Sequence, residues 1–453
     1  MTEYLGAVEE LRQIENKYDL MSVKIKGVSI WPHLRIYLVN KLFKNKEPQT
    51  ISGNYKLVLN TLFAFNPLRA LKKHDIWAFF ATDDRKKIGG QYIESVCGYL
   101  SDLNTNTLLI EKASKVVGHY KKDVIPEKDV ISTSWFYLLI FSYERILRFK
   151  KLKIENQDVI NQVLLDYNID FDYKYYIRVL LAQRRVARLF LGITKKPKLV
   201  FIEAPYVYMG FVWAFHEKGI PVVELQHGVL NEHHYAYNSI YRCGELRPDE
   251  ICVFGIREHK YLTECNKNYA DKITMVGSYI LEKTDEFFTN DIFEEKRKMY
   301  HSIVVVSGQV EIEQVLLQFV EKIANKHQNL LFIYIPRDKN ADISTNCTNV
   351  EIKRGVNIYE YLKWCDIHIT RSSTTCLEAH YFKKPNVFFD YQKMATNYYG
   401  EVLKEENAAF YIDNEDQFDY VYKKIMSNNF KFLELYAHHS KDNIKDVICS
   451  YLN

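Results

Sequence analysis

The chain has 453 residues, enough for two or three domains at a prior of about 150 residues each. Hydrophobic residues make up 47% and charged residues 26%, as in ordinary globular proteins, and the formal net charge is only +4. This balance excludes a chain-wide basic surface for nucleic acid, and no apolar run approaches the ~18 residues that a membrane span needs.

The cysteines and the N-terminus indicate the cellular compartment. The eight cysteines form no CxxC pair and have no histidine at a ligand spacing, so we expect neither a zinc site nor a disulfide framework. The first ten residues contain early acids and no apolar core, unlike a signal peptide. The sequence therefore predicts a cytoplasmic protein with reduced thiols.

The first part of the chain alternates between apolar β-rich runs and helical patterns. Helices are predicted at 3–45 (two, joined at 27–32), from Gly90 to about Leu103, at 130–148 and at 206–218. Strands are predicted at 75–81, 107–110, 198–203, 221–225, 250–254 and 272–276. This alternation predicts a parallel, doubly wound sheet.

A charged stretch at 278–299 interrupts the alternation, which then restarts. Strands are predicted at 302–307, 330–335, 350–353, 367–370 and from 385, and helices at 311–326, 358–364, from 377, at 416–426 and at 431–452. We therefore expect an α/β protein of two Rossmann-like domains facing a central cleft. The predicted domains are 1–285, with helical additions, and 286–453, whose last helix has the option of packing back on the first domain.

Ser372–Thr375 places four consecutive hydroxyl groups between a predicted strand and a predicted helix. Free amides at a helix start and the helix macrodipole favour an anionic ligand, and the hydroxyl groups add donors. The alternative is a helix cap without any ligand, because Ser and Thr are common capping residues. The residues alone leave both interpretations open.

Other strand ends of the second domain add to this candidate site. Ligands of doubly wound sheets bind beyond the carboxyl ends of the strands. Arg337 and Arg371 stand at two such ends, and a guanidinium can hold a phosphate through parallel hydrogen bonds. Gly308 stands at a third end and permits close backbone approach. Together they predict a diphosphate site.

The strand ends of the first domain carry carboxyl groups and an imidazole instead. Asp83, Glu203 and His227 suit proton transfer from an acceptor hydroxyl. Gln226 precedes His227, and Gly228 is expected to let the chain turn sharply after it. The plainer alternatives are a buried, satisfied histidine for His227 and a helix-capping carboxylate for Glu203.

Two pairs of neighbouring residues call for caution. Asp83 and Asp84 fit a turn better than a catalytic role. His233 and His234 could suggest a metal pair, but adjacent residues face opposite ways and no third ligand is evident. We therefore expect these histidines in a loop or an acceptor site.

The layout resembles a glycosyltransferase of the two-Rossmann-domain (GT-B) type. Residues 372–379, followed by Lys384 and Pro385, resemble the donor-phosphate motif of that fold. Residues 31–35 and 225–229 resemble segments of bacterial capsule and O-antigen polysaccharide biosynthesis proteins and, more distantly, of teichoic-acid polymerases. Many of those proteins have a histidine-proline pair at the second strand end of the donor domain, where this chain has Pro336-Arg337.

The resemblance implies a role for each matching residue. The second domain would bind a nucleotide-sugar donor, and the first domain an acceptor. The donor site would comprise Ser372, Ser373, Thr374 and Thr375 on the phosphate, Glu378 on ribose or sugar hydroxyls, Arg337 beside the leaving group, and the backbone around Asn357 at the nucleobase. His227 would be the base or an acceptor-binding residue. The fold normally uses no bound metal, so no cofactor is expected.

The resemblance also implies the reaction: transfer of a sugar from a nucleotide-activated donor to a free or lipid-linked glycan in bacterial surface polysaccharide biosynthesis. Three alternatives stay open. The first two are a polyol-phosphate transferase and a nucleotide-sugar epimerase on the same fold. The third is a non-catalytic scaffold of a polysaccharide assembly complex.

Residues 173–198 form the most basic segment, with eight cations, no acid and apolar residues at helical spacing. A basic amphipathic helix can lie on anionic lipid, which would place the protein at the inner face of the cell membrane. The alternative is an outer helix that packs its apolar side on the sheet.

Overall fold

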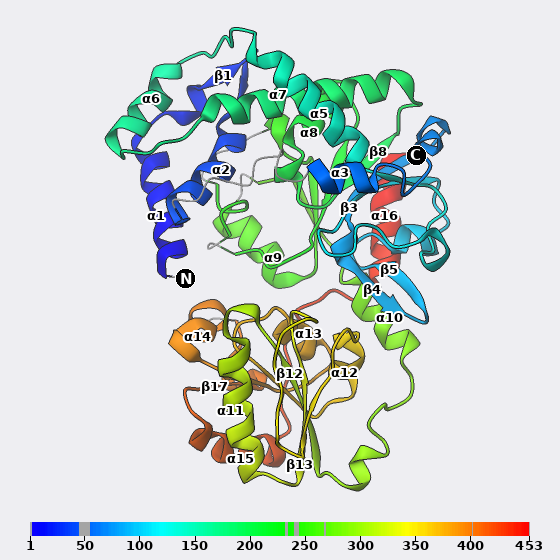
Figure 1. Cartoon of the computed structure of the whole chain (residues 1–453), viewed down its shortest axis with the longest axis vertical. Helices are drawn as coiled ribbons and strands as arrows, with labels where there is room; N and C mark the ends of the chain where they lie inside the picture. Colours follow the sequence, from blue (N-terminus) through cyan, green and yellow to red (C-terminus); the bar gives the residue numbers. More distant parts are fainter. Residues whose placement is uncertain are drawn as a thin grey trace. The chain divides into compact units, whose positions relative to one another are not determined.

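The computed structural model describes residues 2–44, 55–231, 234–239, 244–266, 269–400 and 402–452. The chain forms two compact units (Figure 1). Unit 1 comprises Met1–Lys86, Gln91–Tyr279 and Ala437–Asn453, and unit 2 comprises Lys87–Gly90 and Ile280–Tyr436. The chain therefore passes into unit 2 at residue 280 and returns to unit 1 for its last helix.

Unit 1 is built on a seven-stranded sheet with parallel pairing throughout. In spatial order the strands are β11 (Lys272–Met275), β10 (Glu250–Val253), β9 (Val222–Leu225), β8 (Leu199–Ile202), β3 (Ile76–Ala81), β6 (Thr107–Lys112) and β7 (Val130–Ser132). Most are short apolar runs buried on both faces, as a parallel sheet under helices requires. The order reverses between β3 and β8, which is the switch point of a doubly wound sheet.

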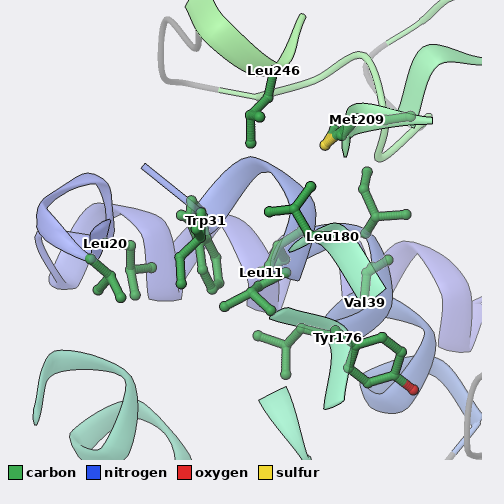
Figure 2. Packing of buried hydrophobic residues seen from close by; sticks show 14 of the residues in the cluster. Leu11, Leu20, Trp31, Val39, Tyr176, Leu180, Met209 and Leu246 are labelled. Carbon is green, nitrogen blue, oxygen red and sulfur yellow. The ribbon is translucent and has the colours of Figure 1, made fainter. Parts of the chain in front are cut away.

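Helices cover this sheet, and the first helices of the chain form an additional helical part of unit 1. They are α1 (Thr2–Lys17), α2 (Trp31–Lys44), α3 (Tyr55–Thr61), α4 (Tyr99–Asp102), α5 (Ser134–Arg148), α6 (Gln157–Asp166), α7 (Tyr173–Ile193), α8 (Met209–His216), α9 (Ile256–Lys260) and α16 (Ser440–Leu452). Figure 2 shows Leu11, Trp31, Tyr176 and Leu180 packed in one cluster, which joins α1 and α2 to α7. The addition therefore shares its core with the helices on the sheet.

Unit 2 is built on a six-stranded parallel sheet. Its strands are β14 (Val350–Ile352), β13 (Leu330–Ile335), β12 (Ser302–Ser307), β15 (Ile367–Thr370), β16 (Asn386–Phe389) and β17 (Ala409–Ile412). Its helices are α11 (Glu313–Lys326), α12 (Ile358–Trp364), α13 (Thr375–Tyr381), α14 (Met394–Tyr399) and α15 (Phe418–Ser427), while α10 (Tyr279–Phe287) begins at the boundary. The switch point lies between β12 and β15. The predicted pair of doubly wound α/β domains is confirmed.

The helix predicted after Gly90 is wrong. Gly89 and Gly90 both adopt positive φ and form the turn between β4 (Arg85–Ile88) and β5 (Gln91–Glu94), which pair as a small sheet. Two adjacent glycines at positive φ are typical of a tight β-hairpin. A second small hairpin, β1 (Lys24–Ile25) with β2 (Val28–Ser29), lies between the first two helices.

Two further predictions are wrong in extent. Residues 130–148 divide into the buried strand β7 and helix α5, because the apolar run is long enough for both. The helix predicted at 431–452 begins only at Ser440, after a stretch that contains His439 at positive φ. Strand β17 and helix α6 had no counterpart among the predictions.

The basic segment forms helix α7, whose Asp172 side chain caps the amide of Tyr175 at 3.0 Å. Most of its apolar residues are buried against neighbouring helices, although Leu189 and Ile193 are exposed. Arg178 and Arg184 pair with Glu144 and Glu217. This packing agrees with the alternative interpretation of the basic segment, in which it is an outer helix with a packed apolar side. Lipid contact through α7 would therefore use only its cationic side. In the described ranges, no helix combines the length and apolar character needed to cross a membrane.

Candidate functional site

Polar side chains follow the strands at both switch points. In unit 1, Asp84 follows β3 and Glu203 follows β8, and these strands are neighbours. In unit 2, Gly308 follows β12 and Arg371 follows β15, which are also neighbours. The carboxyl ends flanking a switch point are the usual ligand sites of such sheets.

The unit 1 site is a cluster of three carboxyl groups. Oxygen atoms of Asp84, Glu94 and Glu203 all lie within 4.8 Å of one another. Glu94 and Glu203 are buried and Asp84 is half-buried, while the amide of Ala81 donates to Glu203 Oε2 at 3.2 Å. Three anions this close require neutralisation, by protons or by a cation.

The pKa values of the carboxyl groups indicate how protons can neutralise this cluster. Burial raises the pKa of Glu203 well above its ordinary value, and the nearby charges of Asp84 and Glu94 raise it further. Burial also raises the pKa of Asp84, although a hydrogen bond with Glu203 opposes the increase. The hydrogen bond between the two groups raises the pKa of Glu203 and lowers that of Asp84, which favours the proton on Glu203. A carboxyl pair that shares a proton can act as acid and base.

Glu94 completes the cluster from hairpin β4–β5. Its Oε2 accepts hydrogen bonds from the amides of Val96 (2.9 Å) and Cys97, whereas Oε1 is buried without a hydrogen-bond partner. Burial and the charge of Asp84 raise the pKa of Glu94 to about 8. The sequence predictions missed this residue, because the run after Gly90 suggested a helix.

A buried ion-pair network fixes the turn that carries Asp84. Arg85 donates to Glu111 at 2.7 Å and to Glu127 at 2.9 Å, with all three side chains buried. The hydroxyl of Thr82 donates to the Lys112 carbonyl at 3.0 Å. Removal of one partner from such a network is costly, so the turn is held firmly beside β6.

His227 lies at the end of β9, half-buried, with Nδ1 buried and unpartnered. Burial, together with the charges of His234 and Lys112, lowers the pKa of His227 to about 4. The ring is therefore neutral at pH 7 and a weaker base than an ordinary histidine. The ring centres of His227 and His234 lie 6.4 and 6.2 Å from that of Tyr206, so this tyrosine lies near both predicted site residues.

The other predicted acceptor residues have different surroundings. Asp83 is exposed, and it is Asp84 that joins the cluster. Gln226 is buried: its amide nitrogen donates to the Gly228 carbonyl at 2.7 Å and its oxygen accepts from the Phe254 amide at 2.7 Å, so it connects the turn after β9 to the end of β10. The expectation that this turn needs Gly228 is wrong, since its φ is not positive and a Cβ there would meet open space. His233 lies outside the described residues.

Arg371 is the central residue of the unit 2 site. It is 7% exposed, and the structure shows no carboxylate ion-paired with it anywhere in the described ranges. Its Nε donates weakly to the Tyr391 carbonyl at 3.4 Å, and its guanidinium lies 5.7 Å from the Tyr391 ring centre. Burying a cation without a counter-ion is unfavourable, which makes Arg371 a candidate anion ligand.

The hydroxyl run has divided surroundings. Ser372 hydrogen-bonds with Gln309 across the switch point, through its amide (3.0 Å) and its hydroxyl (3.2 Å). The hydroxyl of Ser373 accepts a long contact from the Thr375 amide (3.4 Å), and Thr374 is exposed and its side chain makes no capping bond. Thr375 is buried 3.5 Å from His368. Helix α13 has only seven residues, so its macrodipole is short.

The remaining donor-site residues lie around this centre. A Cβ at Gly308 would lie 1.8 Å from Glu313 Oε1, so only glycine fits between β12 and α11. Arg337 is exposed after β13. Tyr359 donates to Glu378 at 3.3 Å, and Asn357 caps α12 by accepting from the Tyr359 amide at 3.1 Å. Asn357 therefore has a structural role as a helix cap, in addition to its predicted role at the nucleobase.

The motif at residues 31–35 is structural in this protein. Trp31 is buried and donates to Glu15 at 2.8 Å, in agreement with its expected packing role. Arg35 forms a buried ion pair with Glu15 at 2.7 Å and donates to Asn238 at 3.1 Å and to the Tyr235 carbonyl. Arg35 therefore holds the segment that follows His234.

No protein-family model and no curated protein sequence matches the chain. Among solved structures, the S. aureus MnaA–UDP co-structure is similar at 11% identity and a TM-score of 0.51, over 84% of this chain and 97% of that chain. A putative UDP-N-acetylglucosamine 2-epimerase from Listeria monocytogenes is 10% identical (TM-score 0.49; 84% and 97% covered), and the glycotransferase of kitacinnamycin is 9% identical (TM-score 0.46; 83% and 94% covered). At such identities the likeness concerns the fold. Together with the two doubly wound sheets, it identifies the fold of this chain as the GT-B type.

Proposed function

We propose that the protein is an enzyme that acts on a nucleotide sugar, with the nucleotide diphosphate held by unit 2 and the acid and base supplied by unit 1. The observation that carries the proposal is the contrast between the switch points. One presents a buried guanidinium without a carboxylate partner, and the other a carboxyl pair with raised pKa values. The fold shared with the MnaA–UDP co-structure supports it and makes UDP the first nucleotide to test.

Reversible proton transfer at a sugar carbon is the reaction that the carboxyl pair fits best. The ionised member removes a carbon-bound proton, and the protonated member returns a proton to that carbon once its other face is turned toward the pair. The configuration at that carbon is then inverted, and no atom is gained or lost. Asp84 and Glu203 can take these two parts because their environment keeps one proton between them. The nucleotide-sugar epimerase alternative is thus better supported than glycosyl transfer.

Glycosyl transfer is the second candidate. It needs one base, Glu203 or His227, to remove the proton of an acceptor hydroxyl, and an acceptor site in unit 1. The groove described below favours it, because the groove reaches the same strand ends. The predicted setting in surface polysaccharide synthesis belongs to this candidate.

The two candidates differ in what happens without an acceptor. UDP-N-acetylglucosamine and other nucleotide sugars would be incubated with the protein in D2O and followed by proton NMR. Deuterium incorporation and a second sugar without added glycan would establish an epimerase, whereas release of UDP only with a glycan extract would establish a transferase. If neither reaction occurs and the protein binds none of UDP, GDP, CDP and dTDP, the scaffold alternative remains.

Metal independence is part of the proposal. The carboxyl cluster is also close enough to hold a divalent cation, so the point needs a direct test. Turnover is expected to persist in EDTA. Loss of turnover that Mg²⁺ or Mn²⁺ restores would show that a cation, rather than a proton, neutralises the cluster.

A further inference from the structure

We infer that unit 1 binds an amphiphile with a phosphate head group, such as a prenyl or acyl phosphate, in an aromatic groove between α2, α3, α5 and α7. Two cavities of about 920 and 260 Å³ lie there. They share Phe141, Tyr175, Tyr176 and Val179 in their linings, so they form one continuous groove. The larger cavity alone is within the ~300–1,000 Å³ typical of small-molecule sites, and the smaller one extends it.

Ordered aromatic rings form the wall of the groove. Tyr176 stacks on Tyr37 with 4.2 Å between ring centres and on Phe171 with 5.0 Å. Phe141 lies 6.2 Å from Tyr55, which connects α5 to α3. Such rings offer a large apolar surface at low entropic cost, as a hydrocarbon chain requires.

The inner end of the groove reaches the carboxyl ends of the sheet. Lys112 ends β6 and lines the smaller cavity with Lys115 and Val207. The charge of Lys112 acts on the pKa values of Asp84, Glu203 and His227, so the groove ends beside the carboxyl cluster. Two lysines at this end suit an anionic head group.

The outer end of the groove opens onto a rim with apolar and charged side chains. Ile146 of α5 lines the larger cavity and is 51% exposed, and Phe149, directly after α5, is 94% exposed. Lys41, Arg145 and Arg148 line the larger cavity together with Glu144, Asp170 and Asp172. Glu144 is paired with Arg148 and Arg178 at 2.9 Å, and Asp172 caps α7. The rim therefore carries charges of both signs, and the lysines that suit an anionic head group lie at the inner end of the groove.

The occupant must therefore combine a long apolar part with a negative head. A prenyl or acyl phosphate that enters from a lipid surface has both parts. Residues 45–54, which connect α2 and α3, lie outside the described residues, and their only large apolar side chain by sequence is Ile51. By composition this linker provides little of the apolar surface that the groove would accommodate.

This inference goes beyond the proposed function, and its test needs no nucleotide. Farnesyl phosphate, farnesol and inorganic phosphate would each be titrated into the full chain by calorimetry. We expect farnesyl phosphate to bind, farnesol to bind at least about tenfold more weakly, and inorganic phosphate not to compete. If inorganic phosphate competes with farnesyl phosphate and farnesol does not bind, the site recognises only the phosphate group and the inference is overturned.

Variants locate the ligand. Phe141→Asp places a carboxylate in the groove wall and should weaken farnesyl phosphate binding about tenfold or more, while Met299→Asp, on the surface of unit 2, should leave it within about threefold. Leu138→Asp, also in the lining, serves if Phe141→Asp fails to fold. Wild-type binding by a folded wall variant, or loss of binding in Arg371→Ala instead, would refute the groove and place the ligand in unit 2.

Discussion

The two units share one topology but place opposite chemistry at the same position. Both sheets are parallel and reverse their strand order once, between β3 and β8 in unit 1 and between β12 and β15 in unit 2. Unit 1 presents three carboxyl groups there, and unit 2 presents Arg371 with hydroxyl groups. The topology fixes where a ligand site can form, and the first residues after each strand decide which chemistry it performs.

The carboxyl cluster of unit 1 and the buried guanidinium of unit 2 are each energetically unfavourable without a partner, and the partner that each needs is different. Adjacent buried carboxyl groups repel one another and hold protons, while a buried guanidinium without an anion forgoes its strongest interaction. Unit 1 is thus prepared for proton transfer and unit 2 for an anion. Each of the following changes would break or sharpen this contrast.

The largest effect is expected at the carboxyl pair. Glu203→Gln removes the shared proton and should lower turnover about 10²–10⁴-fold, the usual contribution of acid–base catalysis. Asp84→Asn should behave similarly, and Asp83→Asn, the exposed neighbour, is the matched control with near wild-type turnover. Full activity in both Glu203→Gln and Asp84→Asn would remove proton transfer from unit 1.

The next effect concerns nucleotide binding. Arg371→Ala should raise the KM for the nucleotide sugar about tenfold or more, since charge-assisted hydrogen bonds contribute roughly 1.5–3 kcal/mol. Arg371→Lys should recover part of the loss. Lys339→Ala, exposed after β13, is the control. An unchanged KM in Arg371→Ala would mean that unit 2 does not hold the anion there.

A smaller effect is expected on stability against pH. The folded-state pKa of Glu94, about 8, exceeds its ordinary value, so its stabilising contribution is present at low pH and is lost as pH rises toward 8. The Tm should therefore fall between pH 6.5 and about 8.5, and Glu94→Gln, which stays neutral, should flatten the decrease. The buried histidines do not interfere, since their pKa values near 4 affect stability only below pH 6.5. Parallel Tm curves for both proteins would show that Glu94 is ionised throughout.

The smallest effect is expected at the turn after β9. Gly228→Ala should change the free energy of unfolding by less than about 0.5 kcal/mol, because its backbone is unstrained and its surroundings are open. Gln226→Ala should cost about 1–3 kcal/mol, because it removes the buried hydrogen bonds of Gln226 with the Phe254 amide and the Gly228 carbonyl. Denaturant unfolding of both variants gives the comparison, and a larger loss for Gly228→Ala would contradict it.

Most strands of the two large sheets were predictable because they are short apolar runs between polar turns, as in 302–307 and 367–370, whereas β7 and β17 were missed. The hairpin at Gly89-Gly90 was not, because its flanking residues have no strict alternation and the following run suits a helix equally well. That error hid Glu94, which reaches the site only through the hairpin. The local sequence was sufficient to propose Arg371 as a site residue. It could not show that Gln309 hydrogen-bonds with Ser372, or that Asp84 rather than Asp83 contacts Glu203, because these contacts join segments that are distant in the sequence.

The most direct test of the division between the units is the affinity of Glu203→Gln for UDP. Calorimetric titration of UDP into this variant is predicted to give the Kd of the wild type, because Glu203 belongs to the proton-transfer site of unit 1 and UDP to the anion site of unit 2. Weakened UDP binding in Glu203→Gln, with wild-type binding in Arg371→Ala, would place the nucleotide in unit 1 and contradict the account.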